Sequence, residues 1–289
     1  MMTKKTELND RQSPSKIAPL ETVTSPYIPS AKWLDLRTVN RGLAKLVDLK
    51  KSYKKSENRV FENAGYELDS VFTDPLGAAA QITKDGLLAG KSVLEIIKDL
   101  QNKHIKISKD KLSKALLGEL HEGQRIIIQT YQDIIKQLDD KIASLTNYII
   151  NEVQNLESKN FMLLQTIPGF DQRSAAIFLT EVGGHEFLDT FANEDRFSSW
   201  VGVSPKKNEI TDNDNSSTSR KGNIYLIHTM CEVAEIASQI KGTAFKSKYN
   251  SLRKRMVHER IIFIIAHKLT RVAYKILAKG EPYIEMNTK

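Results

Sequence analysis

The chain has 289 residues and 40% apolar content, which suits one or two domains with a hydrophobic core and excludes a disordered protein. Its 43 Lys and Arg against 35 Asp and Glu give a net charge of +8, which fits a polyanionic partner and equally a basic protein without one. The single cysteine, Cys231, excludes an intrachain disulfide and fits a reducing compartment. No apolar run reaches the length of a signal peptide or a membrane span, so we expect a cytoplasmic protein.

The first half of the sequence predicts a tail and then a long helical region. Residues 1–30 mix Ser, Thr, Pro and charge without periodicity, and we expect a flexible tail there. We assign residues 31–157 to a helical, coiled-coil region, because apolar residues recur in steps of three and four over 36–60 and again over 128–149. The two seams can pair with each other as an antiparallel hairpin or with a second subunit, and the sequence leaves both open.

Shorter helical pieces are predicted between these helices, over residues 66–107. Ser92 and Glu95 precede an apolar run with the spacing of a capping box. The predicted breaks between the pieces are Asp74-Pro75, Gly86 and Gly90.

Beyond Ser158 the sequence changes to short apolar segments, glycines and turns, which predicts a domain boundary near residue 158. Residues 158–289 then form a compact helical C-terminal domain. Strand signals are sparse throughout, so the expected fold class is mainly α. The helices predicted in this second part cover residues 172–182, 193–201, 223–240 and 257–279.

Residues 163–183, LLQTIPGFDQRSAAIFLTEVG, follow the order helix, Pro-Gly turn, helix that is typical of helix-hairpin-helix DNA binders. In such a hairpin the backbone amides and the next helix N-terminus face a phosphate, and Gly169 after Pro168 supplies the bare backbone this requires. Asp171 occupies the usual second glycine position, where its charge opposes a phosphate unless it caps the next helix. An ordinary helical turn is the alternative.

Two further segments are candidates for nucleic-acid contact. Residues 198–226 hold a long polar loop ending in SRKGN, and such loops are either functional or disordered. Residues 241–279 carry eleven Lys or Arg against one acid, Glu259. On the helix predicted at 257–279 the basic residues lie off the apolar face, which suits either a solvated surface or phosphate contacts. The histidines are scattered, with no metal-site spacing.

Together these segments resemble the region that follows the catalytic domain in Piv/MooV-type insertion-sequence transposases, the IS-one-ten group of bridge-RNA-guided serine recombinases. The resemblance runs from about Leu34 to Met286 and covers nearly the whole chain. It rests on the order and spacing of LDLRTVNRGLAKLVDLKKSYKKSENRVFENAGYELDSVFTD, LQTIPGFDQRSAAIFLTEVG, RFSSWVGVSPKKNE, SRKGN and IIFIIAHKLTRVAYKILAKGEPY.

The resemblance also implies a catalytic apparatus from which this sequence departs. Full-length members carry an N-terminal RuvC-like domain with four metal-binding carboxylates, and the residues before the resemblance are too few for that domain. The family's serine nucleophile falls at Ile210 when positions are counted without gaps from Gly202 to Gly222. An aliphatic side chain cannot form a covalent phosphoester, and the neighbouring hydroxyl of Thr211 has no visible activating base. Ile227 replaces an arginine usual after the Gly-Asn pair.

We therefore expect a transposase-related, DNA-binding protein of DNA transposition that is catalytically inactive alone and needs no cofactor or metal. Its partners are DNA, a structured guide RNA, and a second copy or a full-length transposase. The alternatives are an active recombinase half that works with a separate RuvC-like subunit, and a coiled-coil assembly module that regulates a full-length transposase. The residues expected to contact nucleic acid are Pro168, Gly169, Lys206, Lys207, Arg220, Lys221, Gly222, Asn223, Arg253, Lys254 and Arg255.

Overall fold

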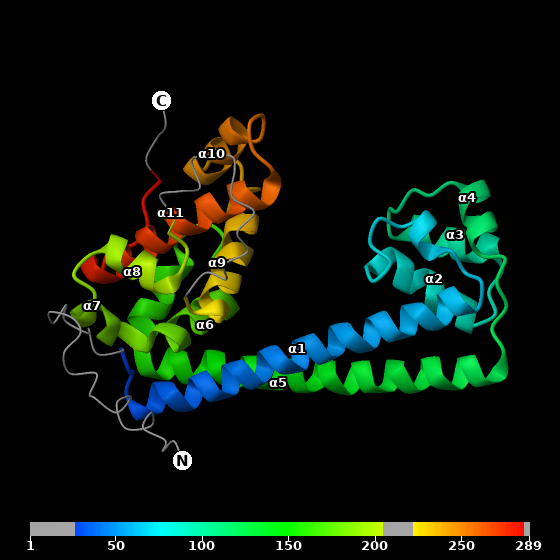
Figure 1. Ribbon diagram of the computed structural model, residues 1–289, viewed down its shortest axis with the longest axis horizontal. Helices are drawn as coiled ribbons and strands as arrows, with labels where there is room; N and C mark the ends of the chain where they lie inside the picture. Colours follow the sequence, from blue (N-terminus) through cyan, green and yellow to red (C-terminus); the bar gives the residue numbers. More distant parts are fainter. Residues whose placement is uncertain (1–26, 205–221, 286–289) are drawn as a thin grey trace, which may run out of the picture.

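The protein is mainly α-helical, as the sequence predicted. The computed structural model describes residues 27–204 and 222–285, and within these ranges there is no β-strand. Two long helices form a hairpin that carries a group of short helices at each end, and both groups lie on the same side of it (Figure 1). None of the helices in the described part of the chain combines the length and hydropathy needed to cross a membrane.

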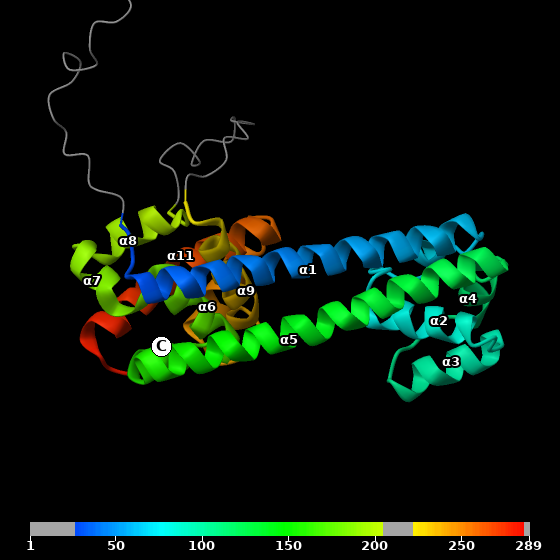
Figure 2. The ribbon, with the colours of Figure 1, turned by 90° about the horizontal axis from the view of Figure 1, so that it is seen from below.

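The hairpin consists of α1 (Ala31–Asn63) and α5 (Glu122–Gln165), which lie side by side and antiparallel (Figure 2). An ion pair joins Lys50 to Asp139 near its middle. The two apolar seams therefore meet each other within one chain, the first of the two pairings that the periodicity allowed. Two helices alone cannot enclose a seam, so its middle is half-exposed, and Ile128 and Ile149 are buried only where the short helices cover its ends.

The first group of short helices fills the closed end of the hairpin. It forms a separate small core around Phe61, Ile96 and Ile128. The capping box is confirmed, because the Ser92 side chain accepts from the amide of Glu95 while the Glu95 carboxylate accepts from the amide of Ser92. The elements of this group are η2 (Leu68–Ser70), α2 (Ala78–Leu88), α3 (Val93–Asn102) and α4 (Lys109–Ala115).

The predicted break at Gly86 is wrong, because α2 continues through this residue to Leu88. A Cβ at Gly86 would lie 2.7 Å from Cγ1 of Ile96 in α3. The glycine thus allows α2 and α3 to pack closely, and the buried contact outweighs its low helix propensity. The break predicted at Gly90 is confirmed, since this residue follows the end of α2 with φ +70°.

The second group of short helices covers the open end of the hairpin. The four helices predicted from the sequence are present within three residues of their expected ends, but α10 was missed. Its sequence, AFKSKYNSL, has an apolar face of only three residues, Phe245, Tyr249 and Leu252, among Lys, Ser and Asn, and of these only Phe245 is fully buried. The elements are α6 (Gln172–Val182), η3 (Gly184–Glu186), α7 (Phe187–Thr190), α8 (Glu194–Val201), α9 (Ile224–Ala237), α10 (Ala244–Leu252) and α11 (His258–Lys279).

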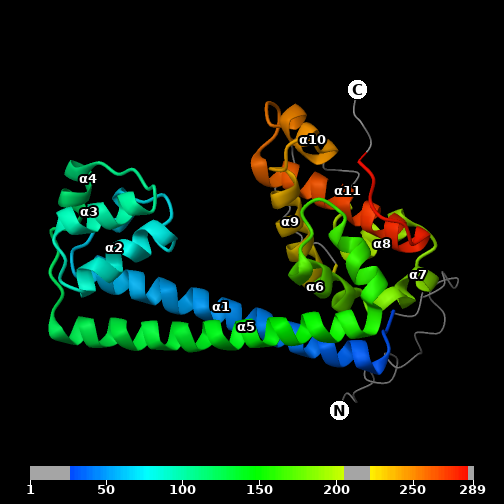
Figure 3. The same cartoon turned by 180° about the vertical axis from the view of Figure 1, so that it is seen from behind.

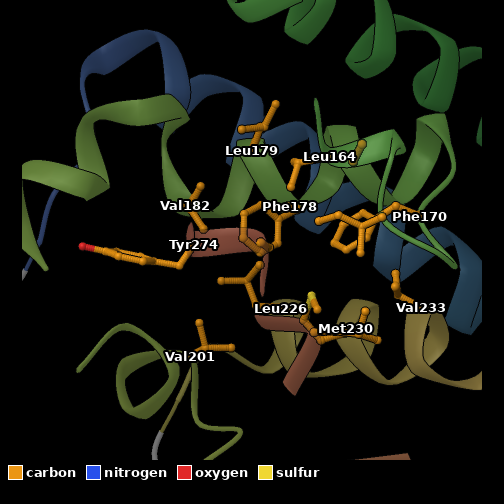
Figure 4. Packing of buried hydrophobic residues seen from close by; sticks show 14 of the residues in the cluster. Leu164, Phe170, Phe178, Leu179, Val182, Val201, Leu226, Met230, Val233 and Tyr274 are labelled. Carbon is orange, nitrogen blue, oxygen red and sulfur yellow. The ribbon is translucent and has the colours of Figure 1, made fainter. Parts of the chain in front are cut away.

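The larger core centres on α6, which is buried on all sides between α1, α5 and α9 (Figure 4). The ring of Phe178 makes edge contacts with Phe170 and Phe187. Trp33 from the start of α1 belongs to the same core, so the open end of the hairpin and the second group of short helices are packed together. The chain leaves helical geometry at Glu157 (φ −144°, ψ 54°), and a domain boundary near residue 158 remains a prediction.

Candidate nucleic-acid interface

The partly buried Pro168-Gly169 turn packs its glycine against α9. Gly169 has φ +93°, and a Cβ there would overlap the carbonyl oxygen of Val233 in α9 and approach the side chain of Ala237 to 3.0 Å. The sequence predicted a bare backbone at Gly169 for the approach of a phosphate, and in the structure this backbone closely approaches α9. A phosphate is not needed to explain the glycine.

The N-terminus of α6 is capped by its own carboxylate. Asp171 accepts a hydrogen bond of 2.7 Å from the amide of Ser174 and another of 2.6 Å from its hydroxyl. From the sequence, Asp171 was expected either to oppose a phosphate or to cap the next helix, and in the structure it caps the helix. Because a negative charge already stands at the positive end of the helix, this N-terminus is a poor phosphate site.

A groove of about 300 Å³ lies beside the turn, between α6 and α9. Its walls include Asp171, Glu232 and Glu235 against the single cation Arg173, so carboxylates outnumber cations along it. The helix-hairpin-helix pattern thus leads to an acidic groove, which repels a nucleic-acid backbone.

Gly222 and Asn223 also have partners within the fold. A Cβ at Gly222 would lie 2.5 Å from the carbonyl oxygen of Val201, and the amide of Asn223 donates to that same oxygen at 3.1 Å. The side-chain oxygen of Asn223 caps α9 by accepting from the amides of Tyr225 and Leu226. These contacts fix the chain where it enters α9, with Gly222 beside the end of α8.

The fully buried carboxylate of Glu181 links the segment that leads into α9 to helix α1 of the hairpin. It accepts hydrogen bonds of 2.8 Å from the side-chain amides of both Asn40 in α1 and Asn223. Arg41 adds an ion pair at 3.3 Å, and its guanidinium also lies 5.1 Å from the centre of the Tyr225 ring. A buried charge is tolerated because donors from two other segments surround it.

Four of the predicted contact residues, Lys206, Lys207, Arg220 and Lys221, lie outside the described residues. The same holds for Ile210 and for the alternative hydroxyl of Thr211.

Two of the basic residues on α11 are engaged in ion pairs. Arg271 and Lys275 contact the Glu194 carboxylate at 3.2 and 2.9 Å, which joins α11 to the start of α8. The hydrogen bond from Lys275 lowers the pKa of Glu194 to about 2. Lys268 extends over the ring of Phe245, 5.5 Å from its centre. The cations of this helix are therefore divided between internal contacts and solvent.

Arg253, Lys254 and Arg255, which we call the basic turn, are exposed between α10 and α11. The backbone is ordered, because the amide of Arg253 donates to the Tyr249 carbonyl at 3.0 Å and that of Arg255 to Leu252 at 2.8 Å. The turn lies at the end of the C-terminal group farthest from the hairpin (Figure 3). Three adjacent exposed cations on a fixed backbone suit contact with phosphates.

Two histidines, His267 and His185, lie in different local environments, which shift their pKa values in opposite directions. Burial lowers the pKa of His267, and nearby Arg271 lowers it further. The hydrogen bond that His185 donates to the Glu157 carboxylate raises the pKa of this exposed imidazole. Within the described ranges, no group of three or more His, Cys, Asp or Glu side chains has the arrangement of a metal site.

The fold and its exposed basic turn define a helical protein with a candidate surface for nucleic acid. Residues 162–250 match the family described as Transposase IS116/IS110/IS902 family. The match supports a transposase-related function of the insertion-sequence type and ends three residues before the basic turn. No curated protein is significantly similar to the chain.

Glu181 and its partners were not predicted from the sequence, although one signal was present. Glu181 is an acid inside the apolar run IFLTEVG, where a buried charge demands a partner. Its partners Asn40 and Asn223 lie far away along the chain, and no local pattern connects them. Tyr249 was missed because the helix that carries it was not predicted.

Proposed function

We propose that this protein binds DNA through its phosphate backbone, as a transposase-related protein of DNA transposition, with the basic turn as a principal contact. The observation that carries the proposal is the exposure of Arg253, Lys254 and Arg255 on an ordered turn directly after the segment that matches a transposase family. Cations on a protein surface bind phosphates irrespective of base sequence, so the contact supplies affinity and leaves base recognition to other groups.

The Pro168-Gly169 turn and the Gly222-Asn223 pair have a supporting part in this proposal. Both are occupied by contacts within the fold, against α9 and Glu181 respectively. Their role is to hold α6 and α9 in place beneath the surface that contacts DNA. Cleavage by a serine nucleophile is not part of the proposal, since Ile210 stands at the position that the resemblance assigns to serine.

The test is fluorescence anisotropy with labelled duplex DNA of random sequence, titrated from low to moderate salt. The variant Arg253→Glu/Lys254→Glu/Arg255→Glu should bind at least about 10-fold more weakly and show a flatter salt dependence, because each lost phosphate contact removes about 0.9 from the slope of log K against log salt. A parallel titration with structured RNA shows which polymer is preferred.

A matched control is available at the other end of the hairpin. Lys103, Lys106 and Lys109 are exposed, and their replacement by Glu changes the net charge by the same amount. Binding should survive in this variant. Equal losses in the two triple variants would mean that only net charge matters, and unchanged binding in the basic-turn variant at low salt would remove the turn from the interface.

A second candidate function is assembly with another copy or with a full-length transposase. The specific observation that favours it is the half-exposed seam in the middle of the hairpin, where Ile135, Leu138 and Ile142 stay partly accessible. A partner helix would bury them. Co-purification with a full-length transposase, lost on Leu138→Glu and independent of DNA, would favour assembly over DNA binding.

A further inference from the structure

Three side chains from three helices form a hydrogen-bonded chain beside the basic turn. The hydroxyl of Tyr249, in α10, lies 2.9 Å from Nδ1 of His258, the first residue of α11. Nε2 of the same imidazole lies 3.0 Å from Oε2 of Glu235 in α9. The side chains of His258 and Glu235 are 46% and 41% exposed, so the group is accessible to a ligand from solvent.

The chemistry of the three groups fixes the direction of the hydrogen bonds. An ionised carboxylate only accepts, so Nε2 of His258 must carry a proton and donate it to Glu235. In the neutral imidazole Nδ1 is then an acceptor, and the Tyr249 hydroxyl donates to it. The order is hydroxyl, base, and a carboxylate that orients the base, the arrangement that activates hydroxyl nucleophiles in enzymes.

The surroundings of this chain of groups favour a phosphodiester as the electrophile. The ammonium of Lys246 lies 5.6 Å from the centre of the Tyr249 ring. The first residue of the basic turn, Arg253, donates its backbone amide to the carbonyl oxygen of Tyr249. DNA held by the turn would therefore bring its phosphates close to the Tyr249 hydroxyl, with cations nearby to stabilise charge on the phosphoryl oxygens.

We propose that Tyr249 is a nucleophile toward phosphodiesters, with His258 as its general base and Glu235 as a positioning residue. The bond that forms joins Oη of Tyr249 to phosphorus, and the bond that breaks joins phosphorus to the leaving oxygen. The tyrosine proton passes to Nδ1 of His258, and the leaving sugar oxygen, on the opposite side of phosphorus, takes up a proton from water. The products are a phosphotyrosyl adduct and a free hydroxyl end, and no oxidant or further reactant is consumed.

With DNA as the natural substrate, this activity rests on the proposed function, but the reaction itself can be measured without DNA binding. The probe is thymidine 5′-(p-nitrophenyl phosphate), a small diester whose leaving group departs as coloured p-nitrophenolate. The intact chain should release up to one equivalent of p-nitrophenolate per chain. Mass spectrometry of its peptides should then place the thymidylyl group on Tyr249.

Variants separate catalysis from a structural role of the three groups. Tyr249→Phe should abolish the adduct, whereas Tyr148→Phe, which alters an exposed tyrosine on the hairpin, should leave it unchanged. His258→Ala should slow adduct formation about 100-fold or more, and added imidazole should restore part of the rate, because general-base catalysis contributes about that much. Thermal unfolding monitored by circular dichroism shows whether each variant is folded.

The outcomes distinguish this inference from the proposed function. Absence of an adduct on the wild-type chain, or an adduct that persists in Tyr249→Phe, overturns the inference and leaves the three groups as a structural link between α9, α10 and α11. An adduct formed by a chain that does not bind duplex DNA would support the inference and overturn the proposed function.

Discussion

The side-chain amide of Asn223 donates a hydrogen bond of 2.8 Å to Oε2 of Glu181, which joins the start of α9 to the buried end of α6. The other carboxylate oxygen accepts from Asn40 in α1, also at 2.8 Å. A single carboxylate therefore sets the relative position of three helices. The segment that leads into α9 is held to the hairpin through side chains, in addition to apolar packing.

Replacing Glu181 with Gln should destabilise the fold. A carboxamide has one acceptor oxygen, so its NH₂ group must face one of the donors that now surround the carboxylate. An unmade hydrogen bond at a buried site costs about 1–3 kcal/mol, and the free energy of unfolding in urea should fall by about that amount. Glu119→Gln removes an exposed carboxylate and serves as the control. A change no larger than that of the control would mean that Glu181 does not hold the helices.

Gly169→Ala should be more damaging than the matched change Gly242→Ala. Both glycines have positive φ, +93° and +81°, so both substitutions carry the backbone cost of about 1 kcal/mol. A Cβ at Gly242 meets no atom within 4 Å, whereas one at Gly169 overlaps the carbonyl oxygen of Val233. Thermal unfolding of the two variants isolates this overlap. Equal shifts in Tm would show that α6 and α9 can move apart without loss.

The elements that the sequence predicted well are those whose apolar residues repeat over many turns. The hairpin helices and α11 follow from such repeats, and α6 follows from its Pro-Gly turn and cap. Gly86 misled the prediction because its role is a contact with Ile96, which the local sequence does not record.

The candidate site was less predictable because its members come from distant segments. The exposed charge of the basic turn could be read directly from the run Arg253-Lys254-Arg255. By contrast, the ion pairs of Arg271 and Lys275 with Glu194 depend on how α8 packs against α11, and the sequence offered only a solvated surface or phosphate contacts for both cations. Gly169 was predicted to face a phosphate, whereas its close backbone contact in the structure is with α9, which the local sequence does not record.

Lys84→Met should destabilise the small core at the closed end of the hairpin. Lys84 and Glu57 are both about 1% exposed, with their charged atoms 4.0 Å apart. Burial lowers the pKa of Lys84 and raises that of Glu57, and each opposite charge counteracts this effect. Removing one partner leaves a buried carboxylate uncompensated, which costs about 3–5 kcal/mol.

The double variant Lys84→Met/Glu57→Gln tests the origin of that loss. Glutamine at position 57 can still accept from the amide of Gln132, which now donates to Glu57 at 2.9 Å. We expect the double variant to be more stable than Lys84→Met in urea unfolding, since no charge remains buried. Additive losses would locate the damage in lost contacts of the Lys84 side chain, whose ammonium lies 5.7 Å from the centre of the Phe61 ring.

Glu194 should contribute stability that depends on pH. The hydrogen bond from Lys275, followed by the amide of Glu194 itself, lowers its pKa in the folded protein from 4.5 to about 2. Because the folded pKa lies below the unfolded one, the contribution is present above pH 4.5 and is lost as the pH falls toward 2. The difference in Tm between wild type and Glu194→Gln should therefore be constant near neutral pH and shrink over this window. High salt should reduce it, since Lys275 is 54% exposed. A Tm difference that stayed constant down to pH 2 would show that the carboxylate charge of Glu194 does not stabilise the contact between α8 and α11.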